Sequence, residues 1–255
     1  MKTFEQTLGL EATNNFLQYS ASQRAVHRCY FTGKLELPGS YRDLQLASGS
    51  DAGCSVDLQK YDVFFYPAEA VASGASPVTP ALADASLERL LVVVPHEDFH
   101  NQGEARGVSP DLAEAAATLI AFLAASEFAR DRYGELSPAF QSLNREAWLF
   151  LQKARVVNLY HDKVSALYSS FRSGKIARQT ALAAKEELFL ELGRECAAIA
   201  PDPVSFNKCP AAMNNAGLAF DNTYTRQYPA MFDRYQQSGE NTRATILDLR
   251  RLLGT

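Results

Sequence analysis

The chain has 255 residues, of which 47% are hydrophobic and 21% are charged, and its formal net charge is −4. These values are typical of a soluble globular protein with one large core or two small ones. The acidic balance gives no reason to expect nucleic acid or an anionic membrane as a partner. We expect no transmembrane segment, and the start, MKTFEQTLGLEATNNF, lacks the basic-then-apolar pattern of a signal peptide. The sequence is compatible with a cytosolic protein and equally with an exported protein whose signal was removed.

The first quarter of the chain is predicted to hold a helix followed by a small sheet. Residues 3–30 place apolar side chains at helical spacing, which predicts a mostly helical segment. Leu37, Pro38 and Gly39 break that pattern. Three runs then alternate or are rich in aromatic and β-branched residues: YRDLQLA at 41–47, CSVDLQ at 54–59 and YDVFFYP at 61–67. We therefore expect a small antiparallel sheet between residues 30 and 67.

The next two predicted elements are helices. The first begins near Asp84 or Ser86, either of which can cap it. Pro95 lies inside this helix, so we expect a kink or an interruption there, with the alternative that LLVVV is a buried strand leading into a helix that begins at Pro95. The second helix spans 110–132, with Ser109 as its cap, and its uncharged stretch AAATLIAFLAAS predicts burial on nearly every side.

Helical periodicity continues to the end of the chain. It predicts helices over 138–171, 176–200 and 242–253, with a less regular, more polar segment over 213–235. No linker divides the chain, so we expect one α+β domain over 1–255. Its sheet-containing part is expected at about 30–83, and its α-rich part, at 84–255, carries the candidate site.

The four cysteines leave the redox state open. Cys29 and Cys54 are far apart, whereas Cys196 and Cys209 flank a proline-containing loop. A disulfide across that loop in an exported protein, or four buried free thiols, would both be ordinary. None of the four has the CxxC spacing of a zinc or redox site.

The strongest functional signal is LVVVPHEDFHNQ at 91–102. His96 and His100 are four residues apart, so on a helix both imidazoles can reach one metal ion. Glu97 then lies beside that metal, where its carboxylate can polarise a bound water. This is the HExxH arrangement of zinc hydrolases. The alternative is two histidines on a helix surface with a neighbouring acid.

A third ligand is expected because catalytic zinc usually takes three protein ligands and keeps one position for water. Glu114 is the best candidate, since a carboxylate among alanines and leucines needs a cation, a metal or strong hydrogen bonds. The other nearby acids are weaker candidates for the third ligand. Glu104 lies on a different face of the same helix or in the following loop, Asp111 suits a capping role, and Glu127 has charged neighbours. The alternative role of Glu114 is an acid stabilised by the helix dipole.

Three motifs in order resemble a bacterial family described as predicted aminopeptidases, which are zincins of the glutamate-ligand (gluzincin) type. They are HEDFHNQ at 96–102, Glu114 followed by AAAT, and NNAGLAFDNTY at 214–224. The resemblance covers roughly residues 60–235. It implies a zincin-like fold around the HExxH helix, Zn²⁺ as cofactor and a peptide as substrate.

The same resemblance implies roles for individual residues. They are the zinc ligands His96, His100 and Glu114, the general base Glu97, the oxyanion donor Tyr224, and the site-lining residues Asn214 and Asn215. The strand at 61–66 resembles the edge strand on which zincin proteases hold an extended peptide. Tyr224 could instead be a core or surface aromatic, and the two asparagines could be capping or turn residues.

The chain also departs from that family. Asp98 and Phe99 replace the usual Leu-Ala pair inside the motif, Asn101 precedes Gln102, and Pro95 stands before the first ligand. The family is usually longer at the N-terminus and tends to carry an export signal. These departures leave every ligating position occupied by a competent residue.

We therefore expect a zinc-dependent peptide hydrolase, with action as an aminopeptidase implied by the family. In this reading Glu97 accepts the proton of the attacking water and returns it to the leaving amine. The first alternative is a non-catalytic zinc-binding helical protein that serves a protein partner, which a fourth ligand such as Asp111 or Tyr224 would favour. The second is a metal-free helical interaction domain. The natural substrate, oligomeric state and compartment stay open.

Overall fold

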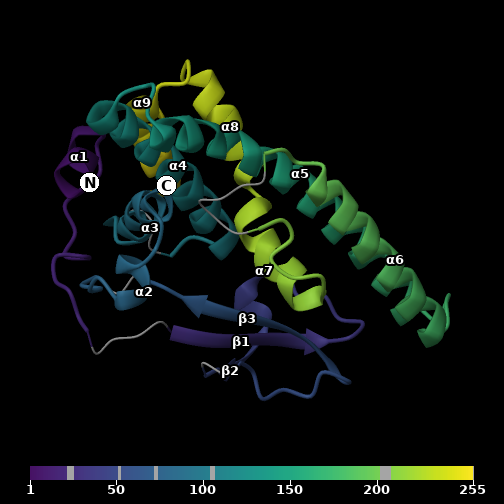
Figure 1. Ribbon diagram of the computed structural model, residues 1–255. Helices are drawn as coiled ribbons and strands as arrows, with labels where there is room; N and C mark the ends of the chain where they lie inside the picture. The colour runs from purple at the N-terminus through teal and green to yellow at the C-terminus, as the bar shows by residue number, and fades with distance from the viewer. Residues whose placement is uncertain (22–25, 51–52, 72–73, 104–106, 202–207, 255) are drawn as a thin grey trace.

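The computed structural model describes residues 1–21, 26–50, 53–71, 74–103, 107–201 and 208–254. The sheet strands are β1 (Val26–Gly33), β2 (Gln45–Ser48) and β3 (Tyr61–Ala68), with the 3₁₀ turn η1 (Tyr41–Asp43) before β2. The helices are α1 (Lys2–Thr7), α2 (Pro80–Ala83), α3 (Leu87–His100), α4 (Pro110–Tyr133), α5 (Pro138–Arg172), α6 (Arg178–Ala197), α7 (Asn215–Thr225), α8 (Tyr228–Gln237) and α9 (Thr242–Leu253). A small antiparallel sheet thus lies beside a helix-rich body, as expected for an α+β protein (Figure 1).

The sheet has the order β2-β1-β3, so β1 is its central strand. The mostly helical segment predicted over 3–30 is therefore wrong. Among the described residues of this range only α1 is helical, and it ends next to Gly9, whose φ of +99° is the left-handed conformation that terminates helices. β1 pairs along its whole length with β3, and these long-range hydrogen bonds outweigh the local helical spacing of its apolar residues.

The other strand predictions hold in part. β3 matches the run predicted at 61–67, whereas only the end of the 41–47 run is a strand. Residues 54–59 are not a strand, because the chain turns there: the N–H of Lys60 donates to the carbonyl of Asp57 at 3.1 Å. Cys54 is held by a disulfide to Cys29 of β1, a pairing that the sequence did not suggest.

α3 is one uninterrupted helix, capped by the hydroxyl of Ser86, which accepts from the N–H of Arg89 at 3.2 Å. The predicted interruption at Pro95 and the alternative strand are both wrong. Leu91, Val92 and Phe99 are buried, and α3 packs along α4. Packing of this apolar face outweighs the single backbone hydrogen bond that proline removes.

α4 is the core helix, in contact with α3, α5, α7, α8 and α9. Among the helices in the described part of the chain, it alone has the length and hydropathy of a membrane span, which we had not expected. Of its most apolar window, 78% is buried inside the molecule. This burial explains the uncharged stretch, because a core helix needs apolar side chains on every side.

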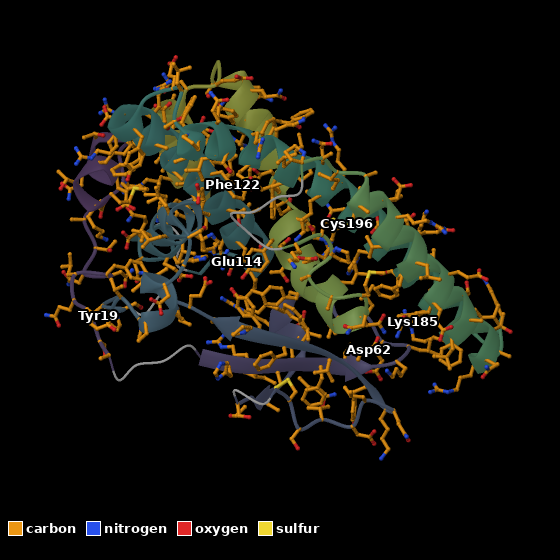
Figure 2. The ribbon with its side chains drawn as sticks, viewed as in Figure 1. Tyr19, Asp62, Glu114, Phe122, Lys185 and Cys196 are labelled. Atoms are coloured by element: carbon orange, nitrogen blue, oxygen red, sulfur yellow. A yellow bond between two sulfur atoms is a disulfide. The ribbon has the colours of Figure 1, made fainter. Side chains whose placement is uncertain are left out.

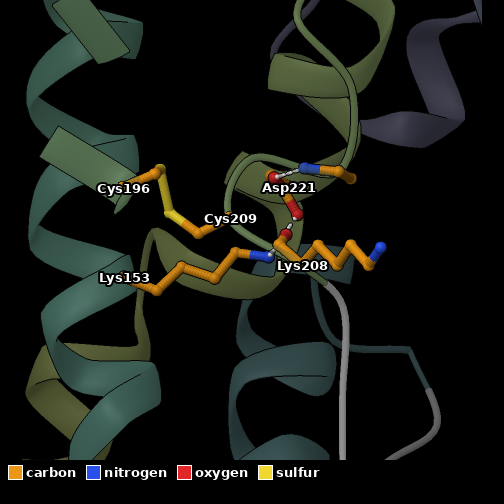
Figure 3. The surroundings of a disulfide bond; sticks show 6 residues. Lys153, Cys196, Lys208, Cys209 and Asp221 are labelled. Carbon is orange, nitrogen blue, oxygen red and sulfur yellow. Dashed lines mark hydrogen bonds and ion pairs between the residues drawn. A yellow bond between two sulfur atoms is a disulfide. The ribbon is translucent and has the colours of Figure 1, made fainter. Parts of the chain in front are cut away.

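The C-terminal helices follow the predicted periodicity, with one exception. The segment over 213–235, predicted to be less regular, consists mainly of α7 and α8. α7 packs against α4, α5 and the sheet, so even its polar residues are buried. A second disulfide joins Cys196 at the end of α6 to Cys209 before α7, and no cysteine in the chain is a free thiol (Figure 3).

Candidate metal centre

Two neighbouring helices bring His96, His100 and Glu114 together. The two histidines lie one turn apart on α3, and Glu114, in the first turns of α4, contacts both of them. Figure 2 labels the position of Glu114. Glu114 Oε2 lies 3.2 Å from His96 Nε2 and 3.1 Å from His100 Nε2. The two Nε2 atoms are 3.2 Å apart. The helix spacing and the packing of α3 on α4 therefore produce a triangle of three potential ligand atoms.

The size of this triangle suits a tetrahedral metal ion. Ligand atoms that lie 2.0–2.1 Å from a tetrahedral zinc are about 3.3 Å from one another. The three observed separations are close to that value, and the three side chains could hold a metal ion. Two imidazoles and a carboxylate are also a ligand set that zinc commonly takes in hydrolases.

Burial makes the charges of this cluster depend on one another. Burial raises the pKa of Glu114, but the facing imidazoles of His100 and His96 outweigh it and hold that pKa well below its usual range. Burial lowers the pKa of His100, yet the carboxylate of Glu114 outweighs that effect and raises the pKa to about 9. Without a metal ion, the cluster is therefore a carboxylate facing a protonated imidazole. A bound cation would take the place of that proton.

Tyr41 supports Glu114 from outside the cluster. Its hydroxyl donates to Glu114 Oε1 at 3.0 Å, and its own backbone N–H donates to the hydroxyl of Thr223 in α7 at 2.8 Å. Such a hydrogen bond orients a ligating carboxylate. Tyr41 lies 73 residues before Glu114, in a run predicted as a strand, and no sequence signal pointed to it.

The cluster opens on a cleft of about 530 Å³. Its walls come from α3, the start of α4, α7 and the sheet. Glu97 lies at this cleft beside His96 and is half-buried, the position from which a carboxylate could act on a water at the metal. The three ligands and the proposed base thus share one opening.

Two of the four tyrosines that line the cleft, Tyr66 and Tyr224, are possible hydrogen-bond donors to a substrate. The ring of Tyr224 stacks on that of His96, with centroids 6.2 Å apart and an interplanar angle of 24°. Burial raises the pKa of Tyr224 well above its usual value and that of Tyr66 to about 12, so both hydroxyls stay protonated near neutral pH. Tyr224 lies where the resemblance implied, and Tyr66 is a second candidate that the sequence did not single out.

Asn214 and Asn215 do not lie among the described residues that line the cleft. Asn214 caps α7 by accepting from the N–H of Gly217 at 3.0 Å, and its amide donates to the carbonyl of Val63 at 2.9 Å. Asn215 is fully buried and accepts from the hydroxyl of Tyr168 at 2.7 Å. The implied substrate contact is therefore not supported; the pair anchors α7 to the sheet and α5, as the capping alternative anticipated in part.

The departures inside the motif have a structural explanation on the other face of α3. Asp98 accepts from Lys2, from the hydroxyl of Thr13 and, at 3.1 Å, from the amide of Asn15. The side-chain amide of Gln102 binds the backbone N–H and carbonyl of Glu11 at 2.8 and 3.2 Å. The N-terminal segment is thereby fastened along the helix that carries both histidines.

The rejected ligand candidates are placed elsewhere or lie outside the described residues. Asp111 accepts from the amide of Gln227 at 3.1 Å, and Glu127 pairs with Arg130. Glu104 lies outside the described residues. Among the His, Cys, Asp and Glu side chains that the structure describes, the cluster has three potential ligands and no fourth.

Comparison with protein-family models, with curated proteins and with solved structures finds no match to this chain. The chemistry of the site must therefore be read from its own atoms. These are three converging ligand atoms, a carboxylate beside them and an open cleft.

Proposed function

We propose that this protein is a zinc-dependent peptide hydrolase with a zincin-like arrangement of helix and sheet. The observation that carries the proposal is the triangle of His96, His100 and Glu114, which has the size of a tetrahedral zinc site and opens on a cleft beside Glu97. The resemblance of the three motifs to the gluzincin family supports the same reading. Aminopeptidase action rests on that resemblance alone.

The chemistry divides between the metal and the chain. When bound, zinc would lower the pKa of its water to about 7 and polarise the peptide carbonyl. Glu97 would accept the proton of the attacking water and deliver it to the leaving amine. Tyr224 or Tyr66, each kept neutral by burial, would donate its hydroxyl to the developing oxyanion.

β3 is suited to hold the peptide. It is an edge strand of the sheet, and Tyr66 and Ala68 at its C-terminal end line the cleft. An extended peptide can add to such an edge through main-chain hydrogen bonds. The amide of Asn214 already binds the carbonyl of Val63 on β3, so the end of β3 nearest the cleft is the part available to a substrate.

A non-catalytic zinc protein is the second candidate, and the geometry favours it less. A structural zinc site is usually closed by four protein ligands. The described His, Cys, Asp and Glu side chains supply three. Of the two candidate fourth ligands, Asp111 is bound to Gln227 and the ring of Tyr224 stacks on that of His96. A cleft at the metal is also of no use to a purely structural site.

The test compares Glu97→Gln with Glu88→Gln, a matched change on the same helix away from the cleft. Both purified proteins should contain about one zinc per chain by elemental mass spectrometry. Cleavage of a mixed pool of short peptides should fall about 10²- to 10⁴-fold in Glu97→Gln and stay unchanged in Glu88→Gln. Protein without stoichiometric zinc after zinc loading, or a Glu97→Gln variant as active as the parent, would overturn the proposal.

A further inference from the structure

Two arginines line the cleft beside the metal cluster. Arg28 extends from the central strand β1 and is half-buried, and its Nη1 donates to the hydroxyl of Tyr30 at 3.1 Å. Arg42 follows Tyr41, the residue that binds Glu114, and is exposed at the cleft. Neither guanidinium forms an ion pair with a carboxylate of the described residues.

The carboxylates of the cleft are already committed. Among the described lining residues, Glu114 belongs to the ligand triangle and Glu97 is the proposed base. Glu69, one residue beyond β3, pairs with Arg89 at 2.8 Å. A Zn²⁺ ion would balance Glu97 and Glu114, which leaves the two arginines as a net charge of about +2 facing the substrate.

This charge distribution bears on which end of a peptide the cleft accepts. An enzyme that binds a substrate ammonium group needs an acidic side chain for it, and the described lining has none to spare. A guanidinium instead matches a carboxylate, because its fixed fork of N–H donors can form two parallel hydrogen bonds. Arg28 uses one of its five donors on Tyr30, so most of the fork is available.

We propose that Arg28 and Arg42 bind a carboxylate of the peptide substrate and make the enzyme selective for peptides that carry one near the cleaved bond. This inference rests on the proposed function, since it assigns the substrate of the same site. The carboxylate can be the C-terminal α-carboxylate or the side chain of an acidic residue. Both present the same group to the arginines.

The experiment measures kcat/KM of the zinc-loaded protein on three otherwise identical peptides. One has a free C-terminus and a glutamate side chain, the second has the same sequence with an amidated C-terminus, and the third has glutamine in place of glutamate. Loss of a charged hydrogen-bonded partner should lower kcat/KM about 10- to 100-fold. A loss on amidation identifies the α-carboxylate as the ligand, and a loss with glutamine identifies the side chain.

Arg28→Gln and Arg42→Gln should lower kcat/KM on the preferred peptide much more than on the peptide that lacks the bound carboxylate, so that the ratio between the two peptides falls toward one. Arg132→Gln, at the exposed end of α4, is the matched control and should behave as the parent. Should Arg28→Gln fail to fold because it lies on the central strand, Arg42→Gln at its exposed position and Arg28→Lys provide the same measurement.

The two proposals fail in different ways. Glu97-dependent hydrolysis of all three peptides at equal rates, or a selectivity that survives both arginine changes, overturns the carboxylate inference and leaves the hydrolase standing. A requirement for a free N-terminal amine, measured with an N-acetylated copy of the first peptide, without any effect of the carboxylates does the same and points to an aminopeptidase. No hydrolysis of any peptide by zinc-loaded protein overturns both.

Discussion

Two of the places where the chain buries charged side chains differ in how the charges are satisfied. One is the cluster of His96, His100 and Glu114, which opens on a cleft. The other is a pair of closed ion pairs that fasten α5, α6 and α7 to one another and to the sheet. In the cluster, three potential ligand atoms point toward one position. In the closed ion pairs, each charge contacts a partner from the chain itself.

The closed pairs are centred on two aspartates. Asp62 of β3 accepts from Lys185, from Lys34 at 2.9 Å and from the N–H of Asn215 at 3.0 Å (Figure 2). Asp221 of α7 accepts from Lys153 at 2.8 Å, and Lys153 also donates to the carbonyl of Lys208 at 2.8 Å (Figure 3). In both groups each buried charge is paired with a group of the chain itself.

The difference shows which buried charges point to a function. Burial alone does not, because Lys153 and Asp221 are as deeply buried as Glu114. The functional signal is the convergence of three lone-pair donors at metal-ligand separations on an open cleft, with a second carboxylate beside them. Three changes test this distinction, from the largest expected effect to the smallest.

Lys153→Met should produce the largest loss of stability. It leaves the carboxylate of Asp221 buried without its cation, and breaking a buried pair in this way costs about 3–5 kcal/mol. Lys163→Met on the same helix is the control, since its partner Glu191 lies 3.7 Å away and both are exposed; that change should cost at most about 1 kcal/mol. Urea unfolding gives both values. Equal losses for the two variants would mean that the closed pair is not the structural element described here.

Loss of the Cys196–Cys209 disulfide should have the next largest effect. It joins the end of α6 to the segment that carries the Lys208 carbonyl, beside Lys153 and Asp221 (Figure 3). Its sequence separation of 13 residues corresponds to about 3 kcal/mol of restricted unfolded-state entropy. The Cys196→Ser, Cys209→Ser double variant should unfold at lower urea and keep its zinc affinity, because the metal ligands lie on other helices.

The matched control is the Cys29→Ser, Cys54→Ser double variant, which should be destabilised by a similar amount. Intact mass spectrometry checks the premise, since reduction should add the mass of four hydrogens to the parent protein. A parent mass unchanged by reduction, or a 196–209 variant that loses zinc, would contradict the account.

The cluster of three potential metal ligands could be predicted from the sequence because its geometry is local. His96 and His100 are one helical turn apart, and Glu114 lies near the start of the very next helix, so two short-range rules bring them close. Helix periodicity likewise predicted α4, α5, α6 and α9. The same rule failed for β1, whose strand character is decided by pairing with β3 far along the chain.

The remainder of the site depends on contacts between distant segments. Tyr41 reaches Glu114 only because Thr223 of α7 holds its backbone, and Arg28 reaches the cleft only because β1 is the central strand. Neither residue lies in a motif. The Cys29–Cys54 pairing was missed for the same reason, since the strand that brings Cys29 to it was predicted as a helix.

The smallest expected effect is on the pH dependence of zinc binding. In the metal-free protein, Glu114 raises the pKa of His100 from 6.5 to about 9, so this contribution to stability is complete below pH 6.5 and is lost as the pH rises through about 9. The pKa of Glu114 is lowered, so its contribution is complete above pH 4.5 and is lost on acidification. Zinc must displace the proton of His100, and its affinity should rise roughly tenfold per pH unit up to about pH 9.

Calorimetric titrations at about pH 8, in buffers with different ionisation enthalpies, count the released protons. A raised His100 pKa predicts that about one proton leaves for each zinc bound, whereas two histidines of ordinary pKa would release almost none. Tyr41→Phe is an informative comparison, because it removes the hydrogen bond to Glu114 while keeping all three ligands. Zinc binding without proton release would show that Glu114 does not hold a protonated His100, and the open cluster would then lack the charge coupling that sets it apart from the closed pairs.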